Sequence, residues 1–475
     1  MAITRRSLFE RSGVLALSTA VWPSWMPRMV FRKENEAPKG DILIVVFARG
    51  GYDGLNMVIP YLDEANYNRL RPSIAIPAPD ANAARKAIDL DGSFGLHPAL
   101  GNADEGRWKQ WWDEGILGMV HAVAMDNDTR SHFDAMDFME RGTPGSKMAR
   151  DGWLGRHLST LANQNASPFR AVGLGSQLQA SLRGPVPAIA LQSIADFHLQ
   201  GKTGEVVRFQ QHLQMLYSGN DWLDQQGQAT FAALDLLEKS IGGATYQPAN
   251  GARYGNDGFS RGMMQIAQLV KAEVGLEVAC VDIGGWDTHA NQVVAGDTTN
   301  GNMATRMREL AGGISALITD LHDRFESGAT KQGVTVVVMS EFGRRAFENG
   351  GTGTDHGHGN VMFTFGRGIK GHKVYTNRWP GLADDDLDRG DLARTTEYRD
   401  VLGEILLKRT GNTNIADVFP GHAFNFLGLA NDLGPTVAPT NTPAQPTAVP
   451  TTPPEPTTPP VGPSHRIFIP NVGNK

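Results

Sequence analysis

Four continuous apolar runs, separated by stretches with helical periodicity, constrain the fold of this chain more than any other feature. The apolar runs lie at residues 41–48, 116–124, 276–283 and 334–339. Stretches with a helical pattern lie between them, at residues 131–141, 258–274 and 303–325. An uninterrupted apolar run is typical of a strand that is buried on both faces. The alternation therefore predicts an α/β fold, with a mostly parallel central sheet and helices on both faces.

The first 38 residues have the pattern of an export signal. Arg5 and Arg6 precede a modestly apolar run at residues 13–21 and then small residues suited to cleavage. The run is too short to span a bilayer, so we expect no transmembrane span. Paired arginines before such a run resemble a twin-arginine signal, which predicts a periplasmic, cell-surface or extracellular location. The alternative is a basic amphipathic helix at the N-terminus.

The C-terminal region predicts a linker and a short tail. Residues 435–463 are almost entirely proline, threonine and small residues, which cannot bury enough apolar surface to offset the entropy of ordering. Residues 464–475 contain a small apolar segment, which is either a handle for attachment to the cell surface or a frayed tail. We expect the folded α/β domain at residues 39–434.

The overall composition excludes several classes of function. A net charge of −6 on 475 residues, without a basic stripe, gives no reason to expect a nucleic-acid partner. Cys280 is the single cysteine, so the chain has neither an internal disulfide framework nor a cysteine-rich zinc site. Any bound metal must therefore be held by aspartate, glutamate and histidine.

Residues capable of coordination or catalysis follow each apolar run. They are Asp53 after the first run, Ser131 after the second, Asp287 and His289 after the third, and Glu341 and Arg344 after the fourth. Two more histidines, His356 and His358, lie among glycines in a loop, where they have little packing to do. Because the carboxyl ends of parallel strands meet at one edge of a sheet, we expect these side chains to converge.

Carboxylates and imidazoles in this pattern predict a divalent metal site with one or two ions, which are zinc, manganese, magnesium or calcium. The expected ligands are Asp53, Asp287, His289, Glu341 and His356. Two alternatives stay open. Asp53 precedes a glycine, and Asp-Gly pairs are common in turns, so Asp53 is alternatively a turn residue without a ligand role. Ser131, at the start of a helix, is suited either to an N-cap or to a nucleophile.

Six short motifs in a fixed order resemble a known family. They are GGYDGLN at Gly50, SHFDA at Ser131, GWLGR at Gly152, GGWDTH at Gly284, SEFGR at Ser340 and DHGHG at Asp355. Over residues 41 to 428 the chain resembles the exported domain of unknown function 1501 family. That family resembles in turn the alkaline-phosphatase-like superfamily of phosphatases and sulfatases.

The resemblance implies an alkaline-phosphatase-like fold and an exported metal-dependent hydrolase of phosphate or sulfate esters, acting on a small-molecule or glycan ester. It implies Ser131 as the nucleophile, with Arg344 and His358 assisting. Phosphatases carry an Asp-His pair where this chain has Glu341-Phe342. His358 or His132 could supply the missing imidazole. This departure and the C-terminal tail favour the alternative, an exported non-catalytic binding or cell-surface protein with the same fold and one bound metal or none.

Overall fold

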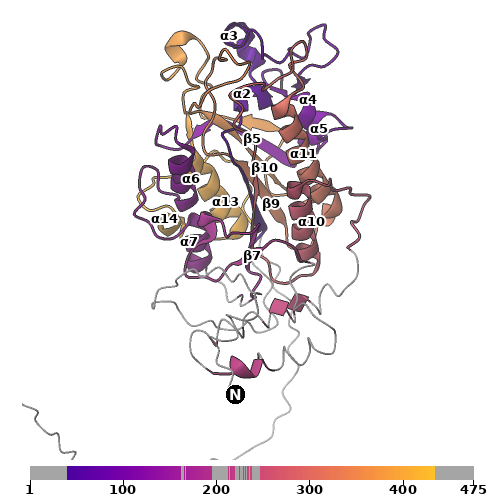
Figure 1. Ribbon diagram of the computed structural model, residues 1–475, viewed down its shortest axis with the longest axis vertical. Coiled ribbons are helices and arrows are strands. Elements are labelled where there is room, and N and C mark those ends of the chain that lie inside the picture. The colour runs from indigo at the N-terminus through magenta and orange to yellow at the C-terminus, as the bar shows by residue number, and fades with distance from the viewer. Residues whose placement is uncertain are drawn as a thin grey trace, which may run out of the picture. The chain divides into compact units, whose positions relative to one another are not determined.

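The predicted sheet forms around the four apolar runs. These become β1 (Ile42–Ala48), β5 (Leu117–Ala124), β8 (Val278–Ile283) and β9 (Val334–Met339). The sheet also contains β6 (Ala171–Leu174), β7 (Ile189–Leu191), β10 (Asn360–Gly366), β11 (Lys373–Tyr375) and β12 (Thr396–Glu397). Its nine strands have the order β11-β5-β10-β9-β1-β8-β6-β7, with β12 also paired to β5 (Figure 1).

Strand direction explains why distant loops meet. Within this sheet β10 runs antiparallel to β5 and β9, and all other pairings are parallel. The prediction of a mostly parallel sheet is thus confirmed. Because β10 is reversed, its first residue lies at the edge where β5, β9, β1 and β8 end. The loop that precedes β10 therefore reaches the carboxyl edge of the sheet.

Helices cover both faces of the sheet. One face packs against α5 (Trp108–Asp113), α10 (Gly258–Lys271) and α11 (Asn302–Asp320), and the other against α6 (His132–Arg141), α7 (Trp153–Thr160) and α13 (Tyr398–Ile405) (Figure 1). Alternate side chains of β1 enter the two cores: Ile44 and Val46 join the first, and Val45 and Phe47 the second. This double burial is why the β1 sequence is apolar throughout.

Shorter elements complete the described fold. The helices are α2 (Gly54–Met57), α3 (Glu64–Leu70), α4 (Pro98–Gly101), α12 (His322–Phe325) and α14 (Ile415–Val418). Short 3-10 turns lie at Tyr61–Asp63, Ala180–Leu182 and Asp384–Asp386, and a π-helical turn at Leu406–Thr410. A second sheet has the order β2 (Val58–Ile59), β4 (Gly95–Leu96) and β3 (Ile88–Asp89). The helix expected at 303–325 is interrupted at Leu321, where α11 ends and α12 follows.

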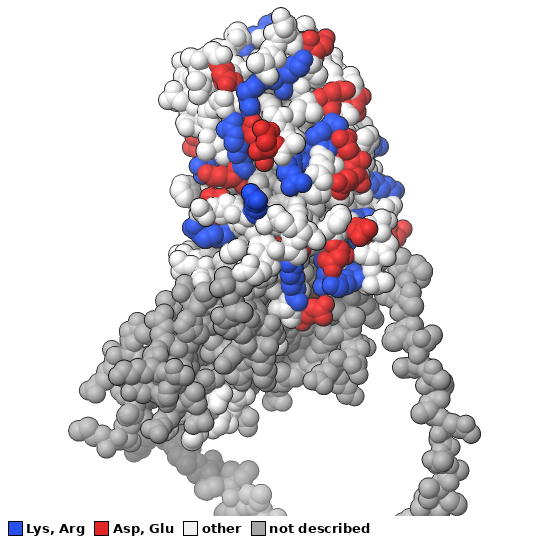
Figure 2. Space-filling model, turned by 90° about the vertical axis from the view of Figure 1, so that its right-hand side faces the viewer, with Lys and Arg blue, Asp and Glu red and all other residues white. Residues whose placement is uncertain are grey.

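The computed structural model describes residues 40–161, 165, 167–194 and 246–433, with isolated positions between 212 and 237. The expected signal at 1–38, linker at 435–463 and tail at 464–475 lie outside the described residues. No helix in the described ranges is long and apolar enough to cross a membrane. On the face shown in Figure 2, basic and acidic side chains are interspersed over the described part.

Candidate metal centre

Three histidines and one aspartate from three strand-end loops lie in contact. His132 opens α6 after β5, Asp287 and His289 follow β8, and His356 precedes β10. One nitrogen each of His132 and His356 and one oxygen of Asp287 all lie within 4.8 Å of one another. The Nε2 atom of His289 lies 3.1 Å from Asp287 Oδ1 and 2.9 Å from His356 Nε2. The expected convergence at the carboxyl edge is therefore present for Asp287, His289 and His356.

The Nδ1 atom of each histidine faces an oxygen that can only accept a hydrogen bond. The pairs are His132 with Glu341 Oε1 at 2.7 Å, His289 with Asp355 Oδ1 at 2.8 Å, and His356 with the Arg130 carbonyl at 2.9 Å. Each Nδ1 must therefore carry the hydrogen, which leaves the lone pair of a neutral ring on Nε2. The three Nε2 atoms are the ones that surround Asp287.

This arrangement of lone pairs calls for a cation or a shared proton. The two Nε2 atoms of His289 and His356 face each other, and burial lowers the pKa of His356, which favours its neutral ring. The Nε2 atom of His132 is buried without a hydrogen-bond partner among the described residues, 3.5 Å from Asp287 Oδ2. Three imidazoles and a carboxylate suit zinc or a similar transition-metal ion better than magnesium or calcium, which prefer oxygen ligands.

Arg344 fixes the position of Asp287. Its Nη2 atom donates to Asp287 Oδ1 at 2.7 Å, and its other contacts are the carbonyls of Gly50, Gly51, Trp286 and Thr354. Desolvation raises the pKa of Asp287, but the hydrogen bond from Arg344 and the close contact with His356 outweigh it and lower that pKa to about 2. Asp287 is therefore a negatively charged carboxylate at neutral pH, and its position suits it to bind a cation.

A glycine pair lets the loop after β1 approach the centre closely. Gly50 and Gly51 have φ angles of 124° and 62°, which strain any residue with a side chain. A Cβ atom on Gly50 would lie 2.7 Å from the backbone nitrogen of Asp287, and one on Gly51 would lie 2.5 Å from the Phe342 ring. The Gly50-Gly51 pair is thus required because the loop after β1 packs closely against the loops after β8 and β9.

Comparison with known proteins identifies the family. A family model described as "Protein of unknown function (DUF1501)" matches residues 117–410. The chain belongs to the DUF1501 family. No curated protein matches it. Among solved structures it is similar to the PH0037 protein from Pyrococcus horikoshii, at 11% identity over 79% of this chain and 98% of that chain, with a TM-score of 0.30. A likeness this weak does not assign an alkaline-phosphatase-like fold.

Asp53 pairs with a buried arginine instead of with the histidine cluster of this DUF1501 protein. Its Oδ1 atom accepts from Arg71 Nη2 at 3.0 Å, and its Oδ2 atom accepts from Arg71 Nη1 and, at 2.7 Å, from Gln292 Nε2. Because Arg71 and Asp53 are both buried and paired, the expected role of Asp53 as a metal ligand does not fit its surroundings. Nothing in the sequence pattern marks Arg71 as the partner of Asp53, and Arg71, Ile74 and Ile76 are all buried in the structure.

Glu341 supports a ligand in the DUF1501 site instead of facing an ion directly. It is buried, its Oε1 atom accepts from Gly50 N at 2.8 Å and from His132, and its Oε2 atom accepts from Ser340. His132, one of the two candidates for the missing imidazole, contacts Glu341 and lies in the cluster. The Phe342 ring packs on His132 and His356, with ring centroids 4.7 Å and 4.9 Å away.

The three residues expected to be catalytic all have structural partners. Ser131 is the N-cap of α6, and its Oγ atom accepts from Asp134 N at 3.4 Å. His358 is buried and its Nε2 atom lies 2.9 Å from the Met125 carbonyl. Arg344 has its donors occupied by protein groups, so the expected contact between its guanidinium and substrate oxygens does not fit. The capping alternative for Ser131 is thus present, and its role as a nucleophile stays a prediction.

Proposed function

We propose that the protein is an exported metal-dependent hydrolase of phosphate or sulfate esters, with a site built on one divalent ion. The observation that carries this proposal is the set of three Nε2 atoms facing the Asp287 carboxylate. The side chains of Asp287 and His289 are 48% and 43% exposed, so the cluster opens to solvent. Catalytic metal sites keep a coordination position open, so an ion with these four protein ligands would take a fifth ligand from the exposed side.

The surrounding residues fit the needs of such a centre. An ion held by His132, Asp287, His289 and His356 would supply a Lewis acid that polarises an ester oxygen and activates water at neutral pH. Glu341 and Asp355 hold the tautomers of His132 and His289, which is the common outer-shell arrangement around histidine ligands. The choice of phosphate or sulfate esters rests on the family resemblance and is an argument by analogy.

A chromogenic assay tests the proposal. The full chain, loaded with zinc or manganese, is incubated with 4-nitrophenyl phosphate, bis(4-nitrophenyl) phosphate and 4-nitrophenyl sulfate. We expect release of nitrophenolate from at least one ester, and its loss in His356→Ala but not in His322→Ala, a histidine on the surface. Metal binding without any hydrolysis would instead support the non-catalytic binding protein. The occupied donors of Arg344 and the pairing of Asp53 with Arg71 favour that alternative.

The proposed export depends on Arg5 and Arg6, which lie outside the described residues. Replacing both with lysine should retain the protein in the cytoplasm, because the twin-arginine signal is read by a receptor. Cell fractionation followed by immunoblotting measures this. Unchanged export of the double variant would show that another route is used.

A further inference from the structure

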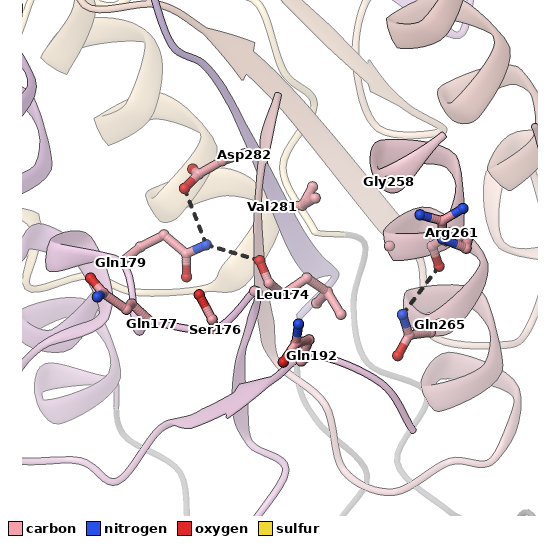
Figure 3. Close-up of a pocket in the computed structure, with 12 residues that line it drawn as sticks. Leu174, Ser176, Gln177, Gln179, Gln192, Gly258, Arg261, Gln265, Val281 and Asp282 are labelled. Atoms are coloured by element: carbon pink, nitrogen blue, oxygen red, sulfur yellow. Dashed lines mark hydrogen bonds between the residues drawn. The ribbon is translucent and has the colours of Figure 1, made fainter. Parts of the chain in front are cut away.

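The carboxyl edge of the sheet also has a cavity whose lining residues do not include those of the histidine cluster. A cavity of about 490 Å³ opens where β6, β7 and β8 end, beside the first turns of α10 (Figure 3). Leu174 is the last residue of β6, Gln192 directly follows β7, and Asp282 lies near the end of β8. The volume is that of a small-molecule site, and the carboxyl edge is where α/β sheets bind ligands.

The wall of this cavity is rich in side-chain amides. Its polar lining residues are Ser176, Gln177, Gln179, Gln192, Arg261, Gln265 and Asp282. Ser176, Gln177 and Gln192 are exposed, and their side chains have no hydrogen-bond partner among the described residues. Each glutamine offers donors and an acceptor at once. Such groups match hydroxyls, which also donate and accept.

Two acceptors in the wall lack a donor. Gln179 is 7% exposed, and its Nε2 atom donates to the Leu174 carbonyl at 3.3 Å and to Asp282 Oδ2 at 3.5 Å (Figure 3). Its Oε1 atom and Asp282 Oδ1 are buried without a hydrogen-bond partner among the described residues. Buried acceptors left unpaired cost free energy. A hydroxyl donor from a bound ligand would remove this cost.

The charged and apolar side chains of the cavity lining indicate which class of ligand fits it. The formal charges of Arg261 and Asp282 cancel within the lining, and Asp282 is also paired with Arg49 at 3.0 Å. The cavity therefore has neither the excess of cations that a phosphate group needs nor a cluster of ligands for a metal ion. Its apolar lining side chains are Leu174 and Val281. A neutral, polar molecule fits this wall best.

We propose that the cavity binds a neutral, hydroxyl-rich ligand of the saccharide class. Amides, one guanidinium and one carboxylate would pair with adjacent hydroxyls, and the apolar side chains would contact a sugar ring. The proposal depends on the cavity alone and stands whether or not the metal centre is catalytic.

Saturation-transfer NMR with the full chain tests it. The probes are glucose, galactose, N-acetylglucosamine, maltose and cellobiose, each at about 10 mM because single saccharides bind weakly, with inorganic phosphate as a charged comparison. We expect transfer to at least one neutral sugar and no displacement by phosphate. The absence of transfer to every sugar, or displacement of the bound sugar by phosphate, would overturn the proposal.

Variants of the wall assign the binding to this cavity. Gln177→Ala combined with Gln192→Ala should weaken binding of the responding sugar by about tenfold, because two sets of hydrogen bonds are lost. Gln110→Ala, at an exposed position on α5, should bind normally. His356→Ala should also bind normally, which separates this site from the metal centre. Unweakened binding in the double variant would place the sugar elsewhere and overturn the proposal.

Discussion

At the scale of single residues, the candidate centre depends on carboxylates that contact the histidines. Glu341 and Asp355 accept from Nδ1 of His132 and His289, and so aim the Nε2 atoms toward Asp287. Asp287 and His289 could be predicted from the sequence because they follow a buried strand, and His356 because it lies among glycines in a loop. Asp355 was not predicted as part of the site, and His132 was named only as one of two candidates for a missing imidazole. Their roles depend on contacts between loops that only the fold determines.

Glu341→Gln tests the supporting role of this carboxylate. The amide keeps the shape but loses the charge that holds the His132 tautomer, so we expect metal affinity to fall by about 10–100-fold. Competition with a fluorescent chelator measures the affinity. Glu140→Gln is the matched control, because that buried carboxylate pairs with Arg49 and not with a histidine. Equal affinities in the two variants would mean that Glu341 does not orient His132.

Ser131→Asn separates capping from catalysis at the start of α6. Asparagine caps helices about as well as serine, so the melting temperature should change little. If Ser131 is the nucleophile, the variant should lose ester hydrolysis as fully as His356→Ala while it keeps the metal. Retained hydrolysis would leave Ser131 as a cap alone.

At the scale of elements, the site exists because the loops after β1, β8 and β9 meet the loop before β10. The apolar runs predicted β1, β5, β8 and β9, because double burial leaves a clear sequence pattern. The reversed direction of β10 could not be predicted, since an apolar run looks the same in either direction. That reversal brings His356 to the other ligands.

Gly50→Ala tests the contact between the loops after β1 and β8. A methyl group there meets the Asp287 backbone, and the φ of 124° disfavours alanine. We expect a loss of about 1–3 kcal/mol in the free energy of unfolding, together with weaker metal binding. Gly284→Ala, in the other glycine pair, has no atom within 4 Å of the added carbon and is the control. Similar denaturation midpoints for the two variants would show that the close approach is not required.

At the scale of the whole molecule, the two cores contain histidines that take no part in the site. Burial lowers the pKa of His121 to about 4 and the pKa values of His97 and His157 to about 3. In the unfolded chain these rings take up protons below about pH 6.5, whereas in the folded chain they stay neutral. The free energy of unfolding should therefore be highest above pH 6.5 and fall as the pH is lowered toward 4.

Each buried ring should contribute a slope of at most about 1.4 kcal/mol per pH unit in this window. Urea denaturation between pH 7.5 and 4.5 measures the slope. His157→Gln should reduce this slope by the contribution of one buried ring. His322→Gln, at an exposed position, should leave the slope unchanged. An unchanged slope in His157→Gln would mean that this ring titrates alike in both states.

The proposed centre of His132, Asp287, His289 and His356 binds one divalent ion, and the metal content of the purified chain measures this binding. The purified full chain is dialysed against zinc or manganese, freed of loosely bound ions, and analysed by inductively coupled plasma mass spectrometry. The proposed site predicts about one ion per chain, with large losses in His356→Ala and Asp287→Asn and none in His322→Ala. A metal-free wild-type chain, or variants that retain as much metal as the wild type, would contradict it.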